Sequence, residues 1–464
     1  MRSISTIILG GGLAGLAAGY GLTKAGAGTE VFENDPAVGG LSKTIRSNGF
    51  YFDLGGHRFF TKKPEIDALI RKLMGGELIS VPRHSKIFLR NNYFDYPLKP
   101  LNALFGMGIP TTVKIVEDYI AEKVKGLRQS PPPLSLEDWV VVNFGRTMFD
   151  IYFREYSEKV WGIDCKRISA DWVAKRISGL SLGSAIKNAF FKVSGRNIPS
   201  LVDRFIYPQL GIGRIAERLR EEIEKDNAVY AGFPVVKVKH SRSAIDSIET
   251  VGGPGARYAS GDVFISTIPI TTLVRLLDPP APSSVLIAAS KLRFRNLVVV
   301  AVMADKKRAT DQTWIYIPEK KIPFGRIHEP TNWSGKMAPE GKTLLVAEYF
   351  SFKGDRIWNA SDEQLADVTS RGLEQIGFIR RSEVLDSNVV RVKHAYPLFE
   401  IGYAEQCEVI YGYLNSFRNL HLAGRSGMFR YYNMDHAIES GLRAADWVIQ
   451  EAMGKRQWAI GMVA

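Results

Sequence analysis

Cysteine is scarce in this chain, and its scarcity excludes several kinds of protein. Cys165 and Cys407 are the only two cysteines among 464 residues. Two cysteines that lie so far apart in sequence provide neither a disulfide framework nor a cysteine-rich metal cluster, and they fit a reducing compartment. We therefore expect a cytoplasmic protein that has no metal site.

The sequence also lacks a long apolar run. No stretch approaches the roughly 20 residues that a membrane-spanning helix requires. Met1 to Ser3 lead directly into a predicted strand, so we expect no cleavable signal. These absences leave peripheral contact with a membrane open.

Acidic residues are outnumbered. Lysine and arginine together number 61, against 48 for Asp and Glu, which gives a net charge of +13. This excess favours anionic partners. The basic residues are scattered and no nucleic-acid-binding module is recognisable, so we expect a phosphate-bearing nucleotide ligand and no nucleic acid. No pattern indicates the oligomeric state.

A glycine-rich turn near the N-terminus predicts a dinucleotide site. A buried strand, a turn with Gly10, Gly12 and Gly15, a small-residue helix and a second strand that ends in Glu33 follow one another. In such a turn the first glycine allows the tight bend, the second lets a pyrophosphate approach the backbone, and the third lets the helix pack on the strand. Glu33 is placed to accept hydrogen bonds from a ribose diol.

A second pair of glycines follows the acid. The stretch Gly39-Gly40-Leu41-Ser42 resembles the extension found in FAD proteins of the amine-oxidase and glutathione-reductase type, in which a second glycine turn contacts the diphosphate. NAD enzymes usually lack this extension. An ordinary glycine turn is the other interpretation. We predict FAD as the cofactor.

Two further stretches end in glycine and carry functional side chains. A predicted strand ends at Gly56 and His57, and this histidine either lies against the flavin ring or is a satisfied buried side chain. Near the C-terminus, a strand ends at Gly424 and turns into a helix, a junction that aims backbone N–H groups and a positive dipole end at a ligand. A surface loop of similar composition is the other interpretation.

The motifs together predict cofactor contacts from Gly10, Gly12, Gly15, Glu33, Gly40, Leu41, Ser42, Gly56, His57, Val236, Gly424, Arg425, Met434 and Asp435.

The order of predicted elements indicates an α/β fold whose cofactor domain is assembled from separate segments. We expect residues 1–62, 203–282 and 415–464 to form a Rossmann-type FAD-binding domain. Residues 63–202 read as a mainly helical insertion, and residues 283–414 as a substrate domain built on a mixed antiparallel sheet.

With these pieces in place, the sequence resembles the FAD-dependent UDP-galactopyranose mutases, within a wider group that includes amine oxidases, protoporphyrinogen oxidase and phytoene desaturases. The specific part of the resemblance lies in Tyr156–Gly162, Pro323–Glu329, Ala347–Tyr349 and the turn from Gly424 to His436. At that turn amine oxidases usually show an acid after the glycine, where this chain has Arg425.

The resemblance implies roles for individual residues. The forked guanidinium group of arginine suits a diphosphate, so Arg326 and Arg176 would stabilise the departing nucleotide, with Lys175 as the alternative to Arg176. His57 would tune or position the flavin. The remaining implied substrate contacts are Tyr156 and Trp161 on the base, the hydroxyls of Tyr349 and Tyr431, and Asn433.

The implied reaction interconverts the ring forms of a nucleotide-diphosphate sugar through an adduct between the sugar and N5 of reduced FAD. NAD(P)H or another reductant would be needed to reduce the flavin. Gly56 stands where bacterial mutases usually have proline, and Asn433 stands where many have an acid. These differences leave the identity of the sugar open. The alternatives are a flavin oxidoreductase that removes hydride from an amine or apolar substrate, and an inactive flavoprotein that serves as a binding module.

Overall fold

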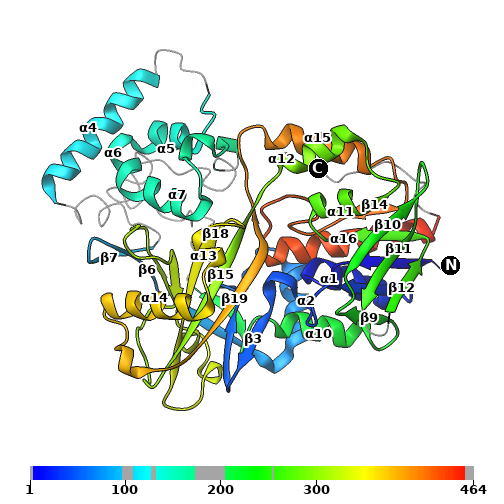
Figure 1. Ribbon diagram of the computed structural model, residues 1–464, viewed down its shortest axis with the longest axis horizontal. Helices are drawn as coiled ribbons and strands as arrows, with labels where there is room; N and C mark the ends of the chain where they lie inside the picture. The colour runs from blue at the N-terminus through cyan, green and yellow to red at the C-terminus, as the bar shows by residue number, and fades with distance from the viewer. Residues whose placement is uncertain are drawn as a thin grey trace.

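The computed structural model confirms the α/β class. It describes residues 4–96, 108–126, 132–171, 173, 204–252 and 255–454. Figure 1 shows two bodies of mixed helix and sheet side by side, with a lobe of helices at the upper left. Lys175 and Arg176 lie outside the described residues.

A five-stranded parallel sheet carries the N-terminal motif. Its spatial order is β20-β13-β1-β2-β9. The chain leaves β1 for β2 on one side and reaches β13 on the other, so the strand order reverses at β1, where open α/β sheets bind their ligands. The strands are β1 (Ser5–Leu9), β2 (Gly28–Glu33), β9 (Ala228–Ala231), β13 (Val263–Ser266) and β20 (Leu420–Leu422).

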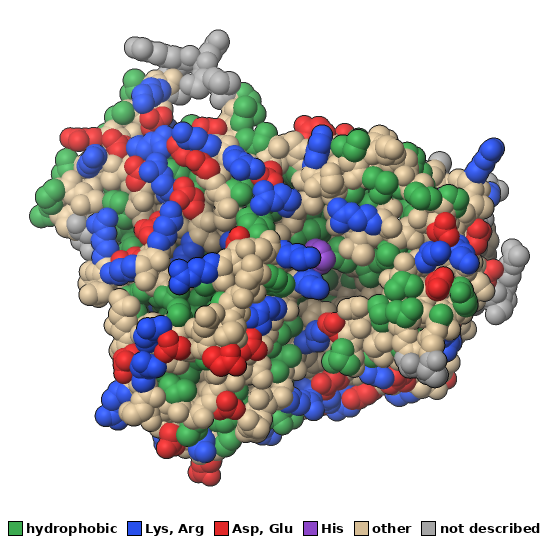
Figure 2. Space-filling model, viewed as in Figure 1, with side chains coloured by type: hydrophobic (Ala, Val, Ile, Leu, Met, Phe, Trp, Pro, Cys, Tyr) green, Lys and Arg blue, Asp and Glu red, His purple; other side chains and the backbone are tan. Residues whose placement is uncertain are grey.

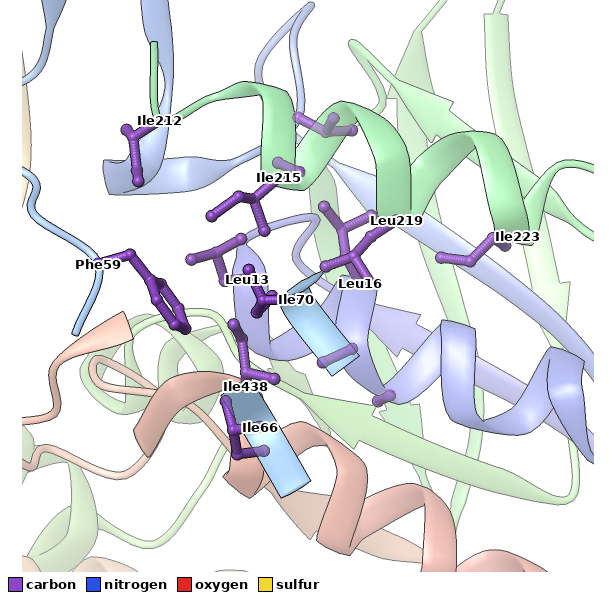
Figure 3. Close-up of a cluster of buried hydrophobic side chains, with 14 of the residues drawn as sticks. Leu13, Leu16, Phe59, Ile66, Ile70, Ile212, Ile215, Leu219, Ile223 and Ile438 are labelled. Atoms are coloured by element: carbon purple, nitrogen blue, oxygen red, sulfur yellow. The ribbon is translucent and has the colours of Figure 1, made fainter. Parts of the chain in front are cut away.

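Helices from distant parts of the sequence pack together beside this sheet. Figure 3 shows Leu13 and Leu16 meeting Ile215 and Leu219, with Ile438 next to them. These side chains recur every three or four residues on their helices and therefore form one apolar stripe each. The helices are α1 (Leu13–Lys24), α2 (Pro64–Met74), α10 (Arg214–Ile223) and α16 (Met434–Ala452).

A seven-stranded sheet forms the second body. Its order is β19-β15-β18-β17-β16-β6-β7. The hairpin of β6 and β7 falls within residues 63–202, the predicted helical insertion, but β6 pairs in parallel with β16 and extends this sheet. The strands are β6 (Ser85–Leu89), β7 (Asn92–Asp95), β15 (Phe294–Ala304), β16 (Trp314–Tyr316), β17 (Arg326–His328), β18 (Thr343–Ser351) and β19 (Val384–Pro397).

Smaller sheets and further helices complete the fold. A four-stranded sheet consists of β10 (Val235–His240), β11 (Ile245–Gly252), β12 (Gly255–Ser260) and β14 (Leu277–Asp278). Two further pairs of antiparallel strands are β3 (Thr44–Ser47) with β4 (Phe50–Asp53), and β5 (Leu78–Pro82) with β8 (Arg204–Pro208). The covering helices are α11 (Ile270–Leu276), α12 (Ser283–Lys291), α13 (Arg356–Asn359), α14 (Asp362–Gln375) and α15 (Tyr403–Leu414).

The helical lobe follows the predicted pattern where it is described. Ser135 Oγ accepts a hydrogen bond from the Asp138 backbone N–H, and the Asp138 carboxylate accepts one from the Ser135 backbone N–H, so a capping box begins α5 (Leu136–Phe144). The domain boundaries themselves stay a prediction. The helical elements of the lobe are α4 (Ile109–Gly126), α5 (Leu136–Phe144), α6 (Arg146–Met148), a π-helical stretch (Phe149–Arg154) and α7 (Glu155–Trp161).

Two kinds of feature are absent from the described residues. No described helix is both long and apolar enough to cross a bilayer. No group of three or more His, Cys, Asp or Glu side chains within the described part of the chain is arranged to hold a metal ion.

Candidate flavin site

The first glycine turn is closed on one side and open on the other. Gly10 has φ +104° and its N–H donates to the Phe32 carbonyl at 2.8 Å. A Cβ on Gly15 would lie 1.9 Å from the Gly10 carbonyl oxygen, so only glycine lets α1 approach β1 this closely. A Cβ on Gly12 would find its nearest atom 4.0 Å away, in Gly40. The open side at Gly12 is where a pyrophosphate could reach the backbone.

Glu33 holds this turn in place. One carboxylate oxygen accepts from the Gly11 N–H at 2.7 Å, and the other accepts from the Asp35 N–H at 2.9 Å. Burial raises the pKa of Glu33, which these hydrogen bonds oppose. A carboxylate has about four acceptor positions, so Glu33 can keep both bonds and still accept from a ribose hydroxyl.

The second glycine pair lies directly against the first turn. The Gly39 N–H donates to the Gly11 carbonyl at 2.8 Å, and a Cβ on Gly40 would stand 3.2 Å from the Gly12 Cα. Gly39 and Gly40 both have positive φ, +108° and +56°. Leu41 is partly buried against the core of the seven-stranded sheet, and Ser42 is buried. The structure thus brings together two motifs that the sequence places almost 30 residues apart.

The C-terminal turn completes the same region. Gly424 has φ +79°, its N–H donates to Ser440 Oγ at 2.9 Å, and its Cβ position lies 3.0 Å from the Ala14 Cβ on α1. Met434 begins α16, after the exposed Asn433 at its N-cap. Asp435 is buried in the first turn of α16.

The guanidinium of Arg425 contacts two aromatic rings. Its guanidinium carbon is 4.7 Å from the ring centre of Tyr396 and 4.5 Å from that of Tyr431. Its Nε and Nη2 are buried and have no hydrogen-bond partner among the described residues, and the same holds for Arg326 Nε and His57 Nδ1. Buried polar groups are normally paired. Such unpaired groups around one site fit a bound ligand that is rich in acceptors.

His57 is fixed by a tight backbone approach. A Cβ on the preceding Gly56 would lie 0.9 Å from the Trp314 ring, so glycine is required there. Burial, followed by the charges of Arg425 and Arg326, lowers the pKa of His57 to about 4. His57 is therefore neutral near pH 7 in this protein.

Arg326 belongs to a buried ion pair. Its Nη2 donates to Glu348 Oε2 at 2.6 Å and to the Tyr396 hydroxyl at 2.7 Å. Burial opposes its charge, but Glu348 and Tyr396 hold the pKa of Arg326 above its ordinary value. Burial raises the pKa of the Glu348 carboxyl, which is fully inaccessible. Tyr396 therefore contacts Arg326 through its hydroxyl and Arg425 through its ring.

Tyr349 faces the other way. Side chains alternate across a strand, so in β18 Glu348 lies toward Arg326 and Tyr349 lies on the opposite face. Its hydroxyl is 2.6 Å from Thr369 Oγ1 on α14, and its ring packs edge-on against Phe324. Tyr349 is 1% exposed in this core. The prediction that Tyr349 contacts the substrate is corrected: it is a core residue.

The two predicted aromatic residues of α7 lie beside the arginine cluster. Tyr156 meets Tyr316 edge-on at 5.7 Å, and Trp161 meets Tyr396 edge-on at 6.4 Å. Arg295 fixes the end of α7, because its Nε donates to the Val160 carbonyl at 2.9 Å. Trp161 is largely buried in the core of the helical lobe, whereas Tyr156 is partly exposed.

Val236 lies apart from these residues, on β10, with 40% of its surface exposed. The segment before it is tied to the end of β2, since the Phe233 N–H donates to the Glu33 carbonyl at 2.8 Å. Its cofactor contact stays a prediction. Arg176 and Lys175 cannot be placed because they fall in the range 174–203, outside the described residues.

Sequence reasoning missed several residues of the cluster. Glu348 lies within the stretch Ala347–Tyr349 but had been given no role, and no role had been predicted for Trp314 or Tyr316. The alternation along β18 was the available signal for Glu348, because a face that carries Tyr349 cannot also carry its neighbour. The contact of Trp314 with Gly56 is long-range, and no local pattern predicts it.

A family model described as flavin containing amine oxidoreductase matches residues 13–449 of this chain. The chain therefore belongs to that family. Its members and solved relatives are flavoproteins, and this protein uses FAD, as its paired glycine turns predict.

Individual relatives are distant. Protoporphyrinogen oxidase 2, chloroplastic/mitochondrial, of Arabidopsis thaliana is 21% identical over 479 residues, covering 95% of this chain and 93% of that protein. A crystal structure of reduced UDP-galactopyranose mutase superposes with a TM-score of 0.83 at 22% identity, covering 98% of this chain and 95% of that one. Cyclohexylamine oxidase from Brevibacterium oxydans IH-35A superposes with a TM-score of 0.69 at 14% identity, covering 97% of this chain and 100% of that one. These structural similarities establish the fold and not the reaction.

The neutral state of His57 has a consequence for stability. The unfolded chain takes up a proton on this histidine below its ordinary pKa of 6.5, whereas the folded protein does so only near 4. Stability should therefore fall as the pH is lowered through this window, by about 3 kcal/mol from this group. We expect a His57→Asn variant to lose less stability than the unmodified protein between pH 7 and pH 4 in urea unfolding. Equal losses would contradict the buried, neutral assignment.

Proposed function

We propose that this protein is a FAD-dependent mutase that interconverts the ring forms of a nucleotide-diphosphate sugar. The observation that carries the proposal is Arg425, whose guanidinium lies beside the rings of Tyr396 and Tyr431 with two buried N–H groups unpartnered among the described residues. A guanidinium presented in this way suits a diphosphate, which offers several anionic acceptors.

The residues present fit a bound flavin. Gly12 leaves open backbone beside the first turn, Gly40 lies against it, and the start of α16 points its N-terminus at the same region. Glu33 keeps acceptor capacity for a ribose. When bound in its reduced form, FAD would supply the nucleophile for the anomeric carbon.

The chain's own residues would act on the nucleotide. As the bond between the anomeric carbon and the diphosphate oxygen breaks, the diphosphate keeps the electron pair and gains charge. Arg425, which the sequence predicted to contact the cofactor, would act here together with Arg326 on that charge, because buried donors are most effective there. The same diphosphate oxygen re-forms the bond after the sugar has exchanged its ring oxygen, so the reaction has no net redox change. Tyr156 would lie against the base, and Tyr431 beside the diphosphate.

A second candidate is a FAD-dependent oxidoreductase. The observation that favours it is the Glu348–Arg326 pair, because the neighbouring carboxylate already neutralises one of the two described cations. The aromatic rings of Trp314, Tyr316 and Tyr156 on the same side suit an apolar substrate. Relatives named as protoporphyrinogen and coproporphyrinogen oxidases agree with this alternative.

One experiment separates the two candidates. The FAD-loaded protein is reduced with dithionite without oxygen and incubated with UDP-galactopyranose, UDP-galactofuranose and a panel of other nucleotide sugars. The mutase proposal predicts a ring isomer of at least one of them. If no sugar is converted, and an amine or a porphyrinogen is oxidised when oxygen is present, the oxidoreductase is the correct assignment.

A further inference from the structure

Arg58 follows His57 directly and brings a further guanidinium next to Arg326. Its guanidinium carbon lies 5.4 Å from the ring centre of Trp314, and that of Arg326 lies 5.3 Å from the centre of the same ring. Arg58 is partly buried, and the second ring that it contacts is Phe205, at 6.0 Å. Because a cation is attracted to the face of an aromatic ring, these two rings hold Arg58 in place.

Aromatic rings link three arginines into one row. Trp314 contacts both Arg58 and Arg326. Tyr396 in turn contacts both Arg326 and Arg425. Arg326 is therefore the middle member, and Arg58 and Arg425 are reached from it through different rings. We call Arg58, Arg326 and Arg425 the arginine row.

The charges of the arginine row indicate how many negative charges its ligand carries. Arg326 is paired with the fully buried Glu348 carboxylate at 2.6 Å. Arg58 and Arg425 contact aromatic rings and have no carboxylate partner among the described residues. Three guanidiniums and one carboxylate therefore leave two positive charges uncompensated. A nucleotide-diphosphate sugar carries one negative charge on each of its two phosphates, so it matches this row only if Arg58 is included.

Arg58 belongs to the end of the row that lies toward the proposed base site. Burial raises the pKa of Tyr316, and the charges of Arg58 and Arg326 oppose that rise, so both guanidiniums act on this hydroxyl. The ring of Tyr316 also meets Tyr156 edge-on at 5.7 Å, and Tyr156 is the residue proposed to lie against the base. Arg425 is at the other end of the row, in the C-terminal turn that packs against the cofactor motif.

We propose that Arg58 is a substrate-binding residue that holds the phosphate nearest the nucleoside, an assignment that rests on the proposed function for the identity of the anion. The guanidinium fork matches phosphate oxygens in two parallel hydrogen bonds. Arg326 and Arg425 are then left for the departing phosphate beside the flavin. The charge on the phosphate nearest the nucleoside does not change as the sugar bond breaks. Arg58 therefore contributes to substrate affinity and not to the rate of the chemical step.

The surface of the molecule suits an anionic ligand as well. Figure 2 shows several Lys and Arg side chains around the hollow at the centre of this face, where Figure 1 places the border between the two bodies. Clefts lined by one sign of charge concentrate ligands of the opposite sign. The net charge of +13 acts in the same direction.

Calorimetric titration of the oxidised, FAD-loaded full chain with UDP and with uridine tests the role of Arg58. Arg58→Met should weaken UDP binding about tenfold, or ~1.4 kcal/mol, and leave uridine binding unchanged, because uridine has no phosphate. Arg58→Lys should recover part of the loss, since it keeps the charge without the fork. Lys123→Met is the control: Lys123 also lies over a ring, that of Tyr119 at 5.4 Å, but on α4, and UDP binding should stay unchanged.

Turnover provides a second readout. With a nucleotide sugar that the protein converts, Arg58→Met should raise KM about tenfold and leave kcat within about twofold, as expected for a contact made equally in the ground and transition states. A fall in kcat with KM unchanged would overturn the assignment to the phosphate nearest the nucleoside.

The titrations also separate failure of this assignment from failure of the proposed function. UDP binding that is lost in Arg425→Met but unchanged in Arg58→Met would overturn the role of Arg58 and leave the nucleotide site standing. Equal losses for UDP and uridine in Arg58→Met, or recovery of this variant without FAD absorbance, would show a disturbed base or cofactor site and overturn it too. If the unmodified protein binds no UDP at about 10 mM, the nucleotide ligand itself is wrong, and the role of Arg58 falls with it.

Discussion

A Gly12→Ala variant should fold normally and be recovered largely without FAD. The added Cβ meets no atom of the chain within about 4 Å, and φ of −73° is acceptable for alanine. The methyl group would occupy the space through which the pyrophosphate reaches the backbone. We expect FAD affinity to fall about 100-fold, or ~2.7 kcal/mol, measured by titration of the apoprotein with FAD.

Gly15→Ala is the contrasting variant. Its Cβ would stand 1.9 Å from the Gly10 carbonyl oxygen, so it should destabilise the fold itself, by about 3 kcal/mol. The two glycines of one motif thus differ in what their substitution changes: FAD affinity for Gly12 and the stability of the fold for Gly15. A Gly12→Ala protein that binds FAD as tightly as the unmodified protein would place the dinucleotide elsewhere.

The second large effect concerns Arg326. Arg326→Ala should reduce turnover of the nucleotide sugar at least 100-fold, or about 2.7 kcal/mol, the usual cost of losing one preorganised donor. FAD content should change little by comparison. The variant should also lose about 3 kcal/mol of stability, because the buried Glu348 carboxylate is left without its partner.

A double variant separates these two losses. Arg326→Met combined with Glu348→Gln removes both charges and keeps the volume of the site similar. It should recover the stability that Arg326→Ala loses, but not the turnover. Recovery of turnover as well would show that Arg326 acts only by balancing Glu348, and the proposed role in stabilising the diphosphate would be wrong.

Much of the cofactor region could be predicted because its determinants are local. One βαβ unit contains Gly10, Gly12, Gly15 and Glu33, and its backbone geometry requires each of these residue types at its position. The α/β class and FAD were both confirmed. The contact of Gly40 with Gly12 was not predictable from spacing alone, because it depends on how the chain after β2 folds back.

The proposed substrate side depends on tertiary contacts, and there the sequence was a poorer guide. Tyr349 was assigned by its motif, but its position in β18 puts it on the core face, beside Thr369. Its neighbour Glu348 reaches Arg326 instead. A one-residue change of register exchanges the two faces of a strand, so a motif can identify a strand correctly and still assign the wrong side chain.

Tyr396 illustrates a second limit. It contacts Arg326 by a hydrogen bond and Arg425 through its ring, yet these residues come from β19, β17 and the C-terminal turn. The seven-stranded sheet places the strands β17 and β19 in one layer, and their order is set by long-range pairing. The arginine cluster is therefore a property of the fold and not of any single stretch.

The central claim is that the flavin site catalyses an isomerisation without net redox change. The most direct measurement is the number of product molecules formed for each electron pair supplied, with the FAD-loaded protein reduced once and mixed with a nucleotide-diphosphate sugar in the absence of oxygen. We expect many ring-isomer molecules for each electron pair, with the flavin spectrum remaining that of the reduced form. Product that forms only in proportion to an oxidant consumed would contradict it.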